Sequence, residues 1–372
     1  MDLSLTESQE MLRSAARTFV EREAPRHTIV ALQRAESSLV PDLWQKASEL
    51  GWLGMLIPER HGGGESTLTD AAVLYEELGR GPLPGPFFTS GVLGALAIME
   101  AGTDAQQSAL LPRVARGEAV LAVAITEPNA SWGPQGVTLV PQRLGGRYRL
   151  DGTKVFVSDA TSATDIVVAV RTGDAPGDVS LLLVDAGAPG VRVRRLSGFL
   201  SWQCEVTFDG PEARLLGDGE NQGWAALESG LLRAWPILCS YMVGGCQAVF
   251  DMSVTHSQVR VQFGVPIGKL QRVQDHIIRL VNHLDAARWT TAEALWKLDT
   301  GRPDAAAAVH MAKAVSSEAY LEACNAAHEV HAGQGSLIEY GLAAHTQMSR
   351  TLFAYLGDPR WHKRRMTDAL SW

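Results

Sequence analysis

The hydrophobic period of the chain changes twice, and this pattern constrains the fold more than any other feature. Apolar residues recur at helical spacing over the first ~118 residues, alternate from about Val120, and return to helical spacing from Gly223. A chain of 372 residues is also long for a single hydrophobic core. We therefore expect an α+β protein with an N-terminal helical domain (1–118), a middle β domain (119–216) and a C-terminal helical domain (217–372).

The two helical regions carry different signals. In the first, Thr6 to Gln9 has the spacing of a capping box, in which two side chains satisfy free backbone N–H groups at a helix start. The second consists of long, Ala-rich segments with apolar stripes, as in a four-helix bundle. The expected helices cover 43–50, 69–78, 91–101 and 104–116 in the first region, and 223–259, 270–300, 304–332 and 339–355 in the second.

The middle region has short apolar runs that alternate every second residue. Asp151-Gly152 interrupts one run, 148–157, with a dipeptide that favours a tight turn between strands. Short, closely spaced strands favour a small barrel or sandwich over a parallel sheet. The other expected strands cover 122–125, 137–140, 166–170, 180–184, 191–195 and 204–208.

Composition excludes several classes of function. The net charge of −8 comes without long basic runs, which argues against a nucleic-acid partner. No uninterrupted apolar stretch approaches ~18 residues, so we expect no membrane span. The four cysteines lack CxxC spacing and no secretory-signal pattern is visible, so we expect a reducing, cytoplasmic location. His328 and His331 are spaced i, i+3 rather than i, i+4, and we expect no metal site.

Four segments carry the functional signal through their order and spacing. Thr126–Pro128 closes a strand, and Lys154–Asp159 lies within the β region. Arg260–Ile267 ends the first long helical segment, and Val330–Gly335 precedes Tyr355–Asp358 by one helix. Each segment alone is a weak signal. In this order they resemble the acyl-CoA dehydrogenase superfamily, and the resemblance runs nearly end to end.

This resemblance implies an FAD-dependent oxidoreductase. Such an enzyme oxidises the α,β bond of an acyl-CoA and passes the electrons to an electron-transfer flavoprotein. It also implies an oligomer, because some FAD contacts in the family come from a neighbouring subunit. The Leu-Gly-Asp ending of the 355–358 segment resembles heteromeric bacterial members that handle bulky substrates such as sterol side chains. Fatty acid or sterol degradation is the implied setting.

The resemblance also implies which β-region residues contact the flavin. Ala124 and Thr126 match the strand beside the pyrimidine edge of the ring. Phe156 stands where many members have tryptophan, against the flavin face, and Ser158 stands where they have threonine, near N5. Both replacements keep the chemistry that a neutral flavin needs, an aromatic plane and a hydroxyl donor.

A second set of residues matches contacts to the dinucleotide part of FAD. Arg260 matches an arginine that reaches the pyrophosphate across a subunit interface, which suits guanidinium geometry. Gln262, Phe263 and Gln271 match neighbouring FAD contacts. Gly333, without a side chain, would let the backbone approach the dinucleotide closely.

Three positions depart from the family pattern. Glu329 replaces the usual glutamine among these FAD-binding positions, and a carboxylate near a pyrophosphate is repulsive by about 1 kcal/mol or more. Ala332 replaces the usual glycine. Trp132 places a bulky side chain in the loop after Pro128, and this side chain would take up space near the thioester or pantetheine arm of the substrate.

The largest departure concerns the base that removes the α-proton. The family position for this glutamate is Leu356, and a second known position, directly before an arginine, is Leu232 before Arg233. Arg233 is the candidate to steer a CoA ester or an anionic acyl group. Asp358 is the nearest carboxylate and the candidate base, although it could instead cap a helix, and Glu228 is a weaker candidate.

Within this resemblance, three functions remain open. The first is an acyl-CoA dehydrogenase with its base elsewhere, as a homo-oligomer. The second is a non-catalytic partner that completes the FAD site of a heterotetramer with a sister subunit. The third is a flavoprotein of the same fold with different chemistry that does not require the glutamate.

Overall fold

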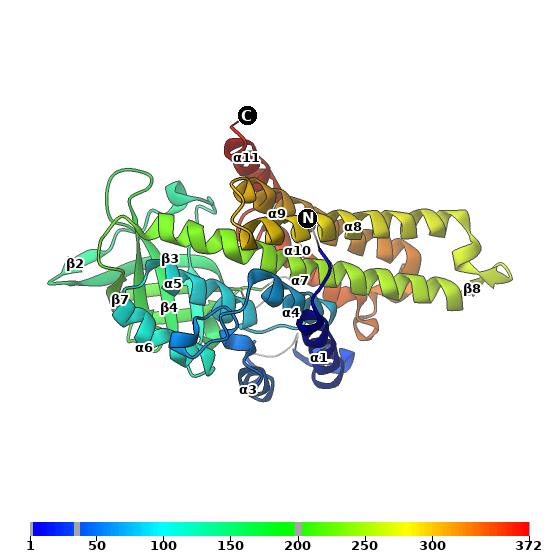
Figure 1. The fold of residues 1–372 in the computed structure, drawn as a ribbon, viewed down its shortest axis with the longest axis horizontal. Coiled ribbons are helices and arrows are strands. Elements are labelled where there is room, and N and C mark those ends of the chain that lie inside the picture. The colour runs from blue at the N-terminus through cyan, green and yellow to red at the C-terminus, as the bar shows by residue number, and fades with distance from the viewer. Residues whose placement is uncertain (1–2, 33–37, 198–202, 372) are drawn as a thin grey trace. The chain divides into compact units, whose positions relative to one another are not determined.

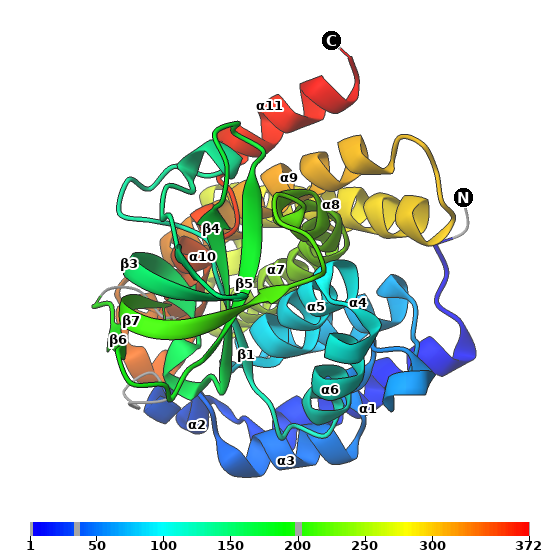
Figure 2. The ribbon, with the colours of Figure 1, turned by 90° about the vertical axis from the view of Figure 1, so that its left-hand side faces the viewer.

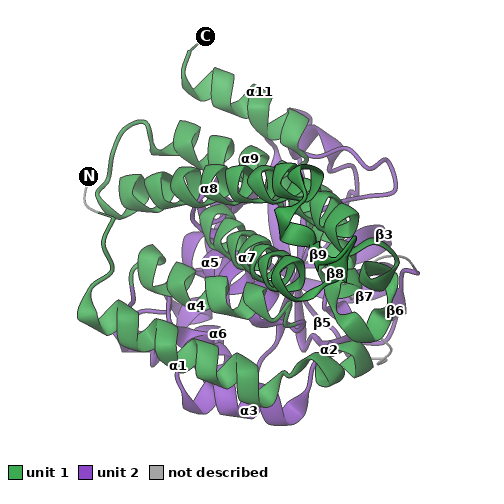
Figure 3. Ribbon diagram, turned by 90° about the vertical axis from the view of Figure 1, so that its right-hand side faces the viewer, with its two compact units in different colours: residues 1–34, 67–83, 235–372 green, residues 35–66, 84–234 purple. Residues whose placement is uncertain are grey.

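The computed structural model describes residues 3–32, 38–197 and 203–371 (Figure 1). The chain forms two compact units (Figure 3). Unit 1 comprises Met1–Arg34, Thr67–Leu83 and Trp235–Trp372, and unit 2 comprises Ala35–Ser66 and Pro84–Ala234. The architecture of helical terminal regions around a mixed-sheet middle region confirms the expected fold class. The boundaries at 118/119 and 216/217 stay predictions.

Unit 2 contains a sheet of seven strands in the order β1-β4-β5-β7-β3-β2, with β6 paired to β7 (Figure 2). Only β1 and β4 are parallel, and every other pairing in this sheet is antiparallel. The core is apolar and includes Leu150, Val168 and Phe208. The strands are β1 Leu121–Ala124, β2 Gln142–Leu144, β3 Arg147–Ser158, β4 Asp165–Arg171, β5 Val179–Asp185, β6 Val191–Arg195 and β7 Gln203–Leu216.

Two expectations for the β region are wrong. Residues 137–140 form no strand, because the Glu127 carboxylate accepts the backbone N–H groups of Thr138 and Leu139. Asp151-Gly152 is not a turn but lies inside β3, beside a register shift against β7. A Cβ on Gly152 would lie 2.8 Å from Leu139 Cδ1, so the glycine makes room for a packed side chain.

The helices of unit 2 are short. They cover the expected helical segments at 43–50, 91–101 and 104–116, and a π-helical turn opens the second of these. The capping box at Thr103 begins the last of them. These elements are α3 Pro41–Glu49, η1 Trp52–Gly54, η2 Glu59–His61, η3 Thr89–Gly94, α5 Ala95–Ala101, α6 Asp104–Ala115, η4 Pro134–Gly136 and η5 Ala160–Ser162.

Unit 1 contains helices at all four positions expected of a bundle, but the last, expected at 339–355, is a 3-10 turn followed by the shorter helix α10. The capping box predicted at Thr6 is present and begins α1. The chain also pairs two short strands here, β8 Val261–Gln262 and β9 Val265–Pro266. The other elements are α1 Glu7–Glu23, α2 Arg26–Leu32, α4 Leu68–Arg80, α8 Gln271–Asp299, α9 Ala305–His331, α10 Leu342–Ala354, α11 Pro359–Ala369, η6 Ile267–Lys269, η7 Ala332–Ser336 and η8 Ile338–Tyr340.

The helix α7, Gly223–Val259, begins in unit 2 and forms the first bundle helix of unit 1. It is long and apolar enough to cross a membrane by length and composition, but 67% of its most apolar stretch is buried within the protein, as in a core helix. In unit 1 it packs against α4 almost backbone to backbone. A Cβ on Gly79 would lie 1.9 Å from the Tyr241 carbonyl oxygen, so only glycine permits this approach.

Four histidines in unit 1 are buried and held neutral. Burial lowers the pKa of His310 and His331 to about 4, of His345 to about 3 and of His362 to about 2. Each is at most 4% exposed. In the unfolded chain a histidine has a pKa near 6.5, so the unfolded state binds more protons than the folded state below that pH.

We therefore expect the stability of the protein to be fully present above pH 6.5 and to fall as the pH drops below it. Between pH 6.5 and 5, each of these histidines can remove up to about 2 kcal/mol from the free energy of unfolding. Urea unfolding at pH 7.5 and 5.0 measures the loss. The variant His331→Gln should reduce the pH dependence, while His27→Gln, at an exposed position, should leave it unchanged. If the free energy of unfolding of His331→Gln depends on pH as strongly as that of the unaltered chain, His331 does not contribute to the loss of stability at low pH.

Candidate functional site

A buried ion pair stabilises the part of unit 2 that carries the residues predicted to contact the flavin ring. Lys154 Nζ lies 2.8 Å from Glu127 Oε1 and donates to the Ile125 carbonyl at 3.0 Å. Lys154 is fully buried and Glu127 is 5% exposed. Burial raises the pKa of Glu127, but Lys154 and hydrogen bonds from Thr138 and Leu139 hold it below its usual value. Burial lowers the pKa of Lys154 to about 8, against the attraction of Glu127, so both groups are charged at neutral pH.

This pair joins the end of β1 to β3. Beside it, the Val155 backbone N–H donates to the Thr126 carbonyl at 2.9 Å. A register shift of β3 against β7 follows Lys154, and within it Phe156 adopts a left-handed backbone with φ +57°. As a result the Phe156 side chain is 48% exposed in an otherwise buried region. Strained, exposed aromatic residues of this kind occur at ligand sites.

The structure thus brings the predicted ring-contact residues of unit 2 to neighbouring strand ends. Ala124 is buried at the end of β1, and Thr126 follows it, half-buried. Ser158, the last residue of β3, is also half-buried. Next to it, Asp159 is buried and accepts a hydrogen bond from the Thr89 hydroxyl at 2.7 Å, which anchors this end of β3. An aromatic plane, hydroxyl groups and strand backbone therefore fit a neutral ring.

Trp132 lies in the loop between β1 and η4 and is half-buried. The loop is held by Asn129, whose amide donates to the Gly136 carbonyl at 3.0 Å and whose carbonyl oxygen accepts the Ser131 N–H at 2.9 Å. Trp132 itself accepts a hydrogen bond from Gln135 on its backbone oxygen. The tryptophan is therefore carried by an ordered loop, and its predicted contact with substrate stays a prediction.

All six residues predicted to contact the dinucleotide lie exposed on unit 1. Arg260 leads into the β8–β9 hairpin, and Phe263 at its tip is 91% exposed with φ +51°. The remaining four share this exposure and come from the hairpin, the start of α8 and the end of α9: Gln262, Gln271, Glu329 and Gly333.

A histidine stack joins two of these elements, and motif reasoning missed it. The rings of His256 on α7 and His331 on α9 have centroids 4.5 Å apart. The His256 carbonyl accepts the N–H of Arg260. His331 Nδ1 is buried and has no hydrogen-bond partner within the described part of the chain. The end of α7, which leads to Arg260, therefore lies beside the end of α9, which leads to Gly333 and carries the unpaired nitrogen of His331.

These features fit an anionic diphosphate. The guanidinium of Arg260 has no hydrogen-bond partner among the described residues. A Cβ added to Gly333 would meet no atom within 4 Å, so open space surrounds its backbone. Ala332 adopts φ +49° and ψ −139°, a conformation that glycine adopts without strain and alanine does not. Among the six residues predicted to contact the dinucleotide, only Glu329 would repel a negatively charged group.

The turn at Leu356 is held from three helices of unit 1. Leu356 is 5% exposed with φ +57°, and its carbonyl accepts the indole N–H of Trp235 at 2.9 Å. His362 Nε2 lies 3.2 Å from the same oxygen and must donate to it. The other ring nitrogen of His362 then accepts from His310 Nδ1 at 2.9 Å. On α9, Lys313 contacts the Gly357 carbonyl at 3.4 Å.

The two predicted catalytic residues have structural partners. Asp358 is the N-cap of α11, and its carboxylate accepts the Trp361 N–H at 2.6 Å. Arg233 pairs with Glu100 within unit 2, with 2.9 Å between Nη1 and Oε1. The α7 residue that contacts the Leu356 turn is Trp235. The roles of Asp358 as a base and of Arg233 in steering substrate stay predictions.

Comparison with known proteins gives the family context. The chain matches the N-terminal, middle and C-terminal domain models of acyl-CoA dehydrogenases over residues 6–118, 122–210 and 221–370. It is 30% identical to the cyclohex-1-ene-1-carbonyl-CoA dehydrogenase of Geobacter metallireducens over 95% of each chain. Among solved structures it is similar to a variant of the steroid ACAD Tcur3481-Tcur3483 (28% identity, TM-score 0.87, 98% of both chains). It is also similar to PigA with FAD and proline (25% identity, TM-score 0.89, 100% of this chain and 99% of that chain).

The buried ion pair generates a stability prediction. Lys154→Met leaves the Glu127 carboxylate buried without a cation, and we expect the free energy of unfolding to fall by about 3–5 kcal/mol. The double variant Lys154→Met/Glu127→Gln should recover part of the loss, because the amide is neutral and still accepts hydrogen bonds. Urea unfolding measures both.

The matched control is an exposed ion pair that shares β3 with Lys154. Arg147 on β3 pairs with Glu212 on β7, and both side chains are more than 60% exposed. Arg147→Met should cost less than about 1 kcal/mol, as exposed ion pairs do. Equal losses in Lys154→Met and Arg147→Met would mean that the buried pair does not stabilise unit 2.

Proposed function

This chain belongs to the acyl-CoA dehydrogenase family and is an FAD-dependent oxidoreductase, and from that premise we propose that it is one subunit of a heteromeric acyl-CoA dehydrogenase. The assembly oxidises the α,β bond of an acyl-CoA and passes the electrons to an electron-transfer flavoprotein. A sister subunit supplies the carboxylate that accepts the α-proton. The name of the similar steroid ACAD, Tcur3481-Tcur3483, joins two gene products, which supports a paired assembly.

The observation that carries this proposal is the side chain at position 356. An α-proton beside a thioester is weakly acidic, and a positioned base contributes about 10²–10⁴-fold to its removal. Leu356 is a buried hydrocarbon and has no group that accepts a proton. Asp358, the next carboxylate along the chain, is exposed and engaged as a helix cap. The chain therefore lacks a base at the position where its family relies on one.

The residues of this chain would still serve the cofactor. FAD, when bound, accepts the hydride released as the α,β bond is oxidised. In unit 2 the exposed face of Phe156 is an aromatic plane for the ring, and Thr126 and Ser158 bring hydroxyl groups near it. In unit 1 the guanidinium of Arg260 is free to pair with the diphosphate across a subunit interface.

In this subunit Leu356 would place an apolar side chain at the position where the family has its base. Its carbonyl is held by Trp235 and His362, so the turn keeps a fixed conformation although its side chain is apolar. A left-handed backbone costs a leucine roughly 1 kcal/mol relative to glycine, and the surrounding donors hold it there. The turn thus keeps its conformation without a carboxylate at position 356.

The decisive experiment compares the purified chain with the chain co-expressed with a sister subunit that carries a glutamate at one of the two family positions. We expect the chain alone to be deficient in FAD and not to bleach with acyl-CoA under anaerobic conditions. The co-expressed pair should be yellow and should bleach. Glutamate to glutamine in the sister should abolish bleaching, while Asp358→Asn in this chain should not, because asparagine keeps the helix cap.

Two results would contradict the proposal. If the chain alone is yellow and bleaches with acyl-CoA, its base lies within its own sequence, and loss of bleaching in Asp358→Asn would identify it. If the pair binds FAD but no acyl-CoA bleaches it, the chain is a flavoprotein of this fold with different chemistry. The absorbance of the flavin in the visible range distinguishes these two outcomes.

Glu329 provides a separate test of the FAD-binding positions. Removing its charge by Glu329→Gln should remove a repulsion of about 1 kcal/mol and tighten FAD binding roughly fivefold. The control is Glu322→Gln, two turns earlier on α9, which should not change the affinity. Fluorescence titration with FAD of the co-expressed pair, freed of its cofactor, measures both. Equal affinities in Glu329→Gln and the unaltered chain would place this carboxylate away from the diphosphate.

A further inference from the structure

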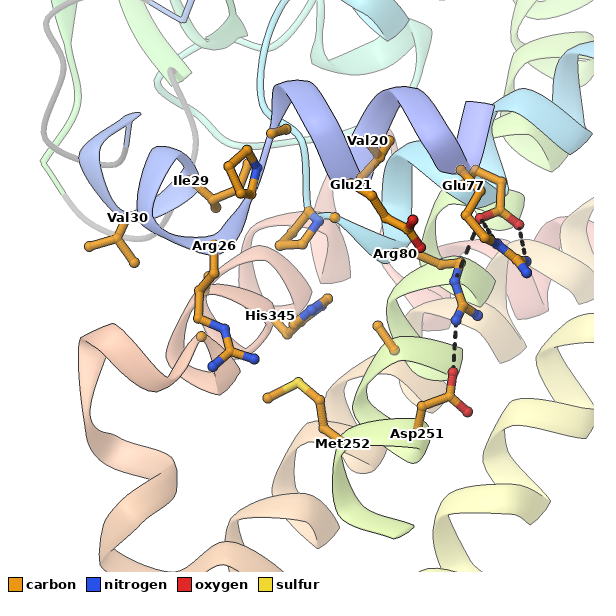
Figure 4. A pocket seen from close by; sticks show the side chains of 18 residues that line it. Val20, Glu21, Arg26, Ile29, Val30, Glu77, Arg80, Asp251, Met252 and His345 are labelled. Atoms are coloured by element: carbon orange, nitrogen blue, oxygen red, sulfur yellow. Dashed lines mark hydrogen bonds and ion pairs between the residues drawn. The ribbon is translucent and has the colours of Figure 1, made fainter. Parts of the chain in front are cut away.

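Unit 1 contains a pocket of about 330 Å³ that the proposed function does not use. It lies among α1, α2, α4, α7 and α10, and none of the predicted FAD, acyl-CoA or base residues lines it (Figure 4). Arg26 and His345 lie at one end, and Glu77, Arg80 and Asp251 lie at the other (Figure 4). Much of the remaining wall is apolar and includes Val20, Ala24, Ile29, Val30, Ala248 and Met252.

His345 presents a hydrogen-bond donor to this pocket. It is 4% exposed, and its Nδ1 lies 2.9 Å from the hydroxyl of Tyr320. Tyr320 is fully buried, and burial raises its pKa well above the ordinary value, so the hydroxyl keeps its hydrogen. It donates that hydrogen to Nδ1, because nothing else in the described chain accepts it. The neutral His345 then carries its hydrogen on Nε2, which has no partner among the described residues.

Arg26 provides a cation at the same end. Its guanidinium lies 5.5 Å from the centre of the Tyr340 ring, a cation–π distance. A Cβ on Gly341 would lie 2.9 Å from Arg26 Nε, so the glycine makes room for the arginine stem. Within residues 3–32, 38–197 and 203–371, no hydrogen bond or ion pair occupies this guanidinium. This end of the pocket therefore offers two hydrogen-bond donors, the Arg26 guanidinium and the Nε2–H of His345, that have no acceptor among the described residues.

At the opposite end two acids are paired with arginines, whereas Glu21 of α1, which also lines the pocket, has no ion pair within the described residues and repels an anion. Glu77, 2% exposed, accepts two hydrogen bonds from Arg17 at 3.0 and 2.7 Å. Arg80 approaches Glu77 at 3.6 Å and pairs with Asp251 at 2.8 Å. These acids are saturated by cations. An anion that enters the pocket is therefore directed to the Arg26–His345 end.

We propose that this pocket binds a small monocarboxylate with an apolar body of about four to six carbon atoms, a size set by a volume at the low end for ligand pockets. The carboxylate pairs with Arg26 and accepts the Nε2–H of His345. The apolar body lies along Val20, Ile29 and Met252. One cation and one neutral donor match a single negative charge, whereas a doubly charged phosphate would be poorly compensated beside an apolar wall.

Isothermal titration of the full-length chain with hexanoate tests the proposal. We expect one equivalent of hexanoate to bind. Hexanamide has a similar size but no charge, and its affinity should be lower by about tenfold or more. Arg26→Gln should weaken hexanoate binding roughly tenfold or more, because it removes a charged hydrogen bond. Arg22→Gln, on the exposed surface of α1 outside the pocket, is the matched control and should bind normally.

A second variant separates this pocket from any other hydrocarbon site. Ala248→Leu fills the pocket from α7 and should abolish hexanoate binding, with the fold checked by circular dichroism. The proposal is overturned if hexanoate binds equally well to the unaltered chain, Arg26→Gln and Ala248→Leu, or if hexanamide matches hexanoate. Displacement of hexanoate by inorganic phosphate at a similar concentration would also overturn it.

Discussion

The buried pair of Glu127 and Lys154 is the interaction on which the ring-facing part of unit 2 depends. It is expensive to bury two charges, and such a pair persists only when further hydrogen bonds satisfy both partners. Here the carboxylate also accepts the backbone of Thr138 and Leu139, and the ammonium also donates to Ile125. One pair therefore fixes the end of β1, the β-bulge at Phe156 and the segment that follows the Trp132 loop.

The Leu356 turn shows the same separation between framework and chemistry. Donors from α7 and α11 hold its carbonyl, and Lys313 on α9 contacts the next one. None of these contacts involves the side chain at position 356. The backbone arrangement of the turn therefore does not depend on a carboxylate at position 356.

The fold was largely predictable because local periodicity determines it, and β6 at Val191–Arg195 has the expected bounds. The strand expected at 137–140 did not form because a side chain from the preceding segment, Glu127, satisfies the backbone N–H groups of Thr138 and Leu139. The motif segments selected the candidate residues, but they gave no information on the contacts that hold those residues in place. That Arg233 meets Glu100, and that Trp235 meets the Leu356 turn, follow from helix register and packing, which a single sequence does not encode locally.

The β8–β9 hairpin has a consequence for the protein in solution. Phe263 is 91% exposed, and Val259 and Val261 beside it are 71% and 52% exposed, so the hairpin carries a bare apolar tip on a single chain. Burying that tip against another subunit removes it from water and favours association. By mass action, the apparent melting temperature of the protein should rise with its concentration, since dilution returns the tip to solvent.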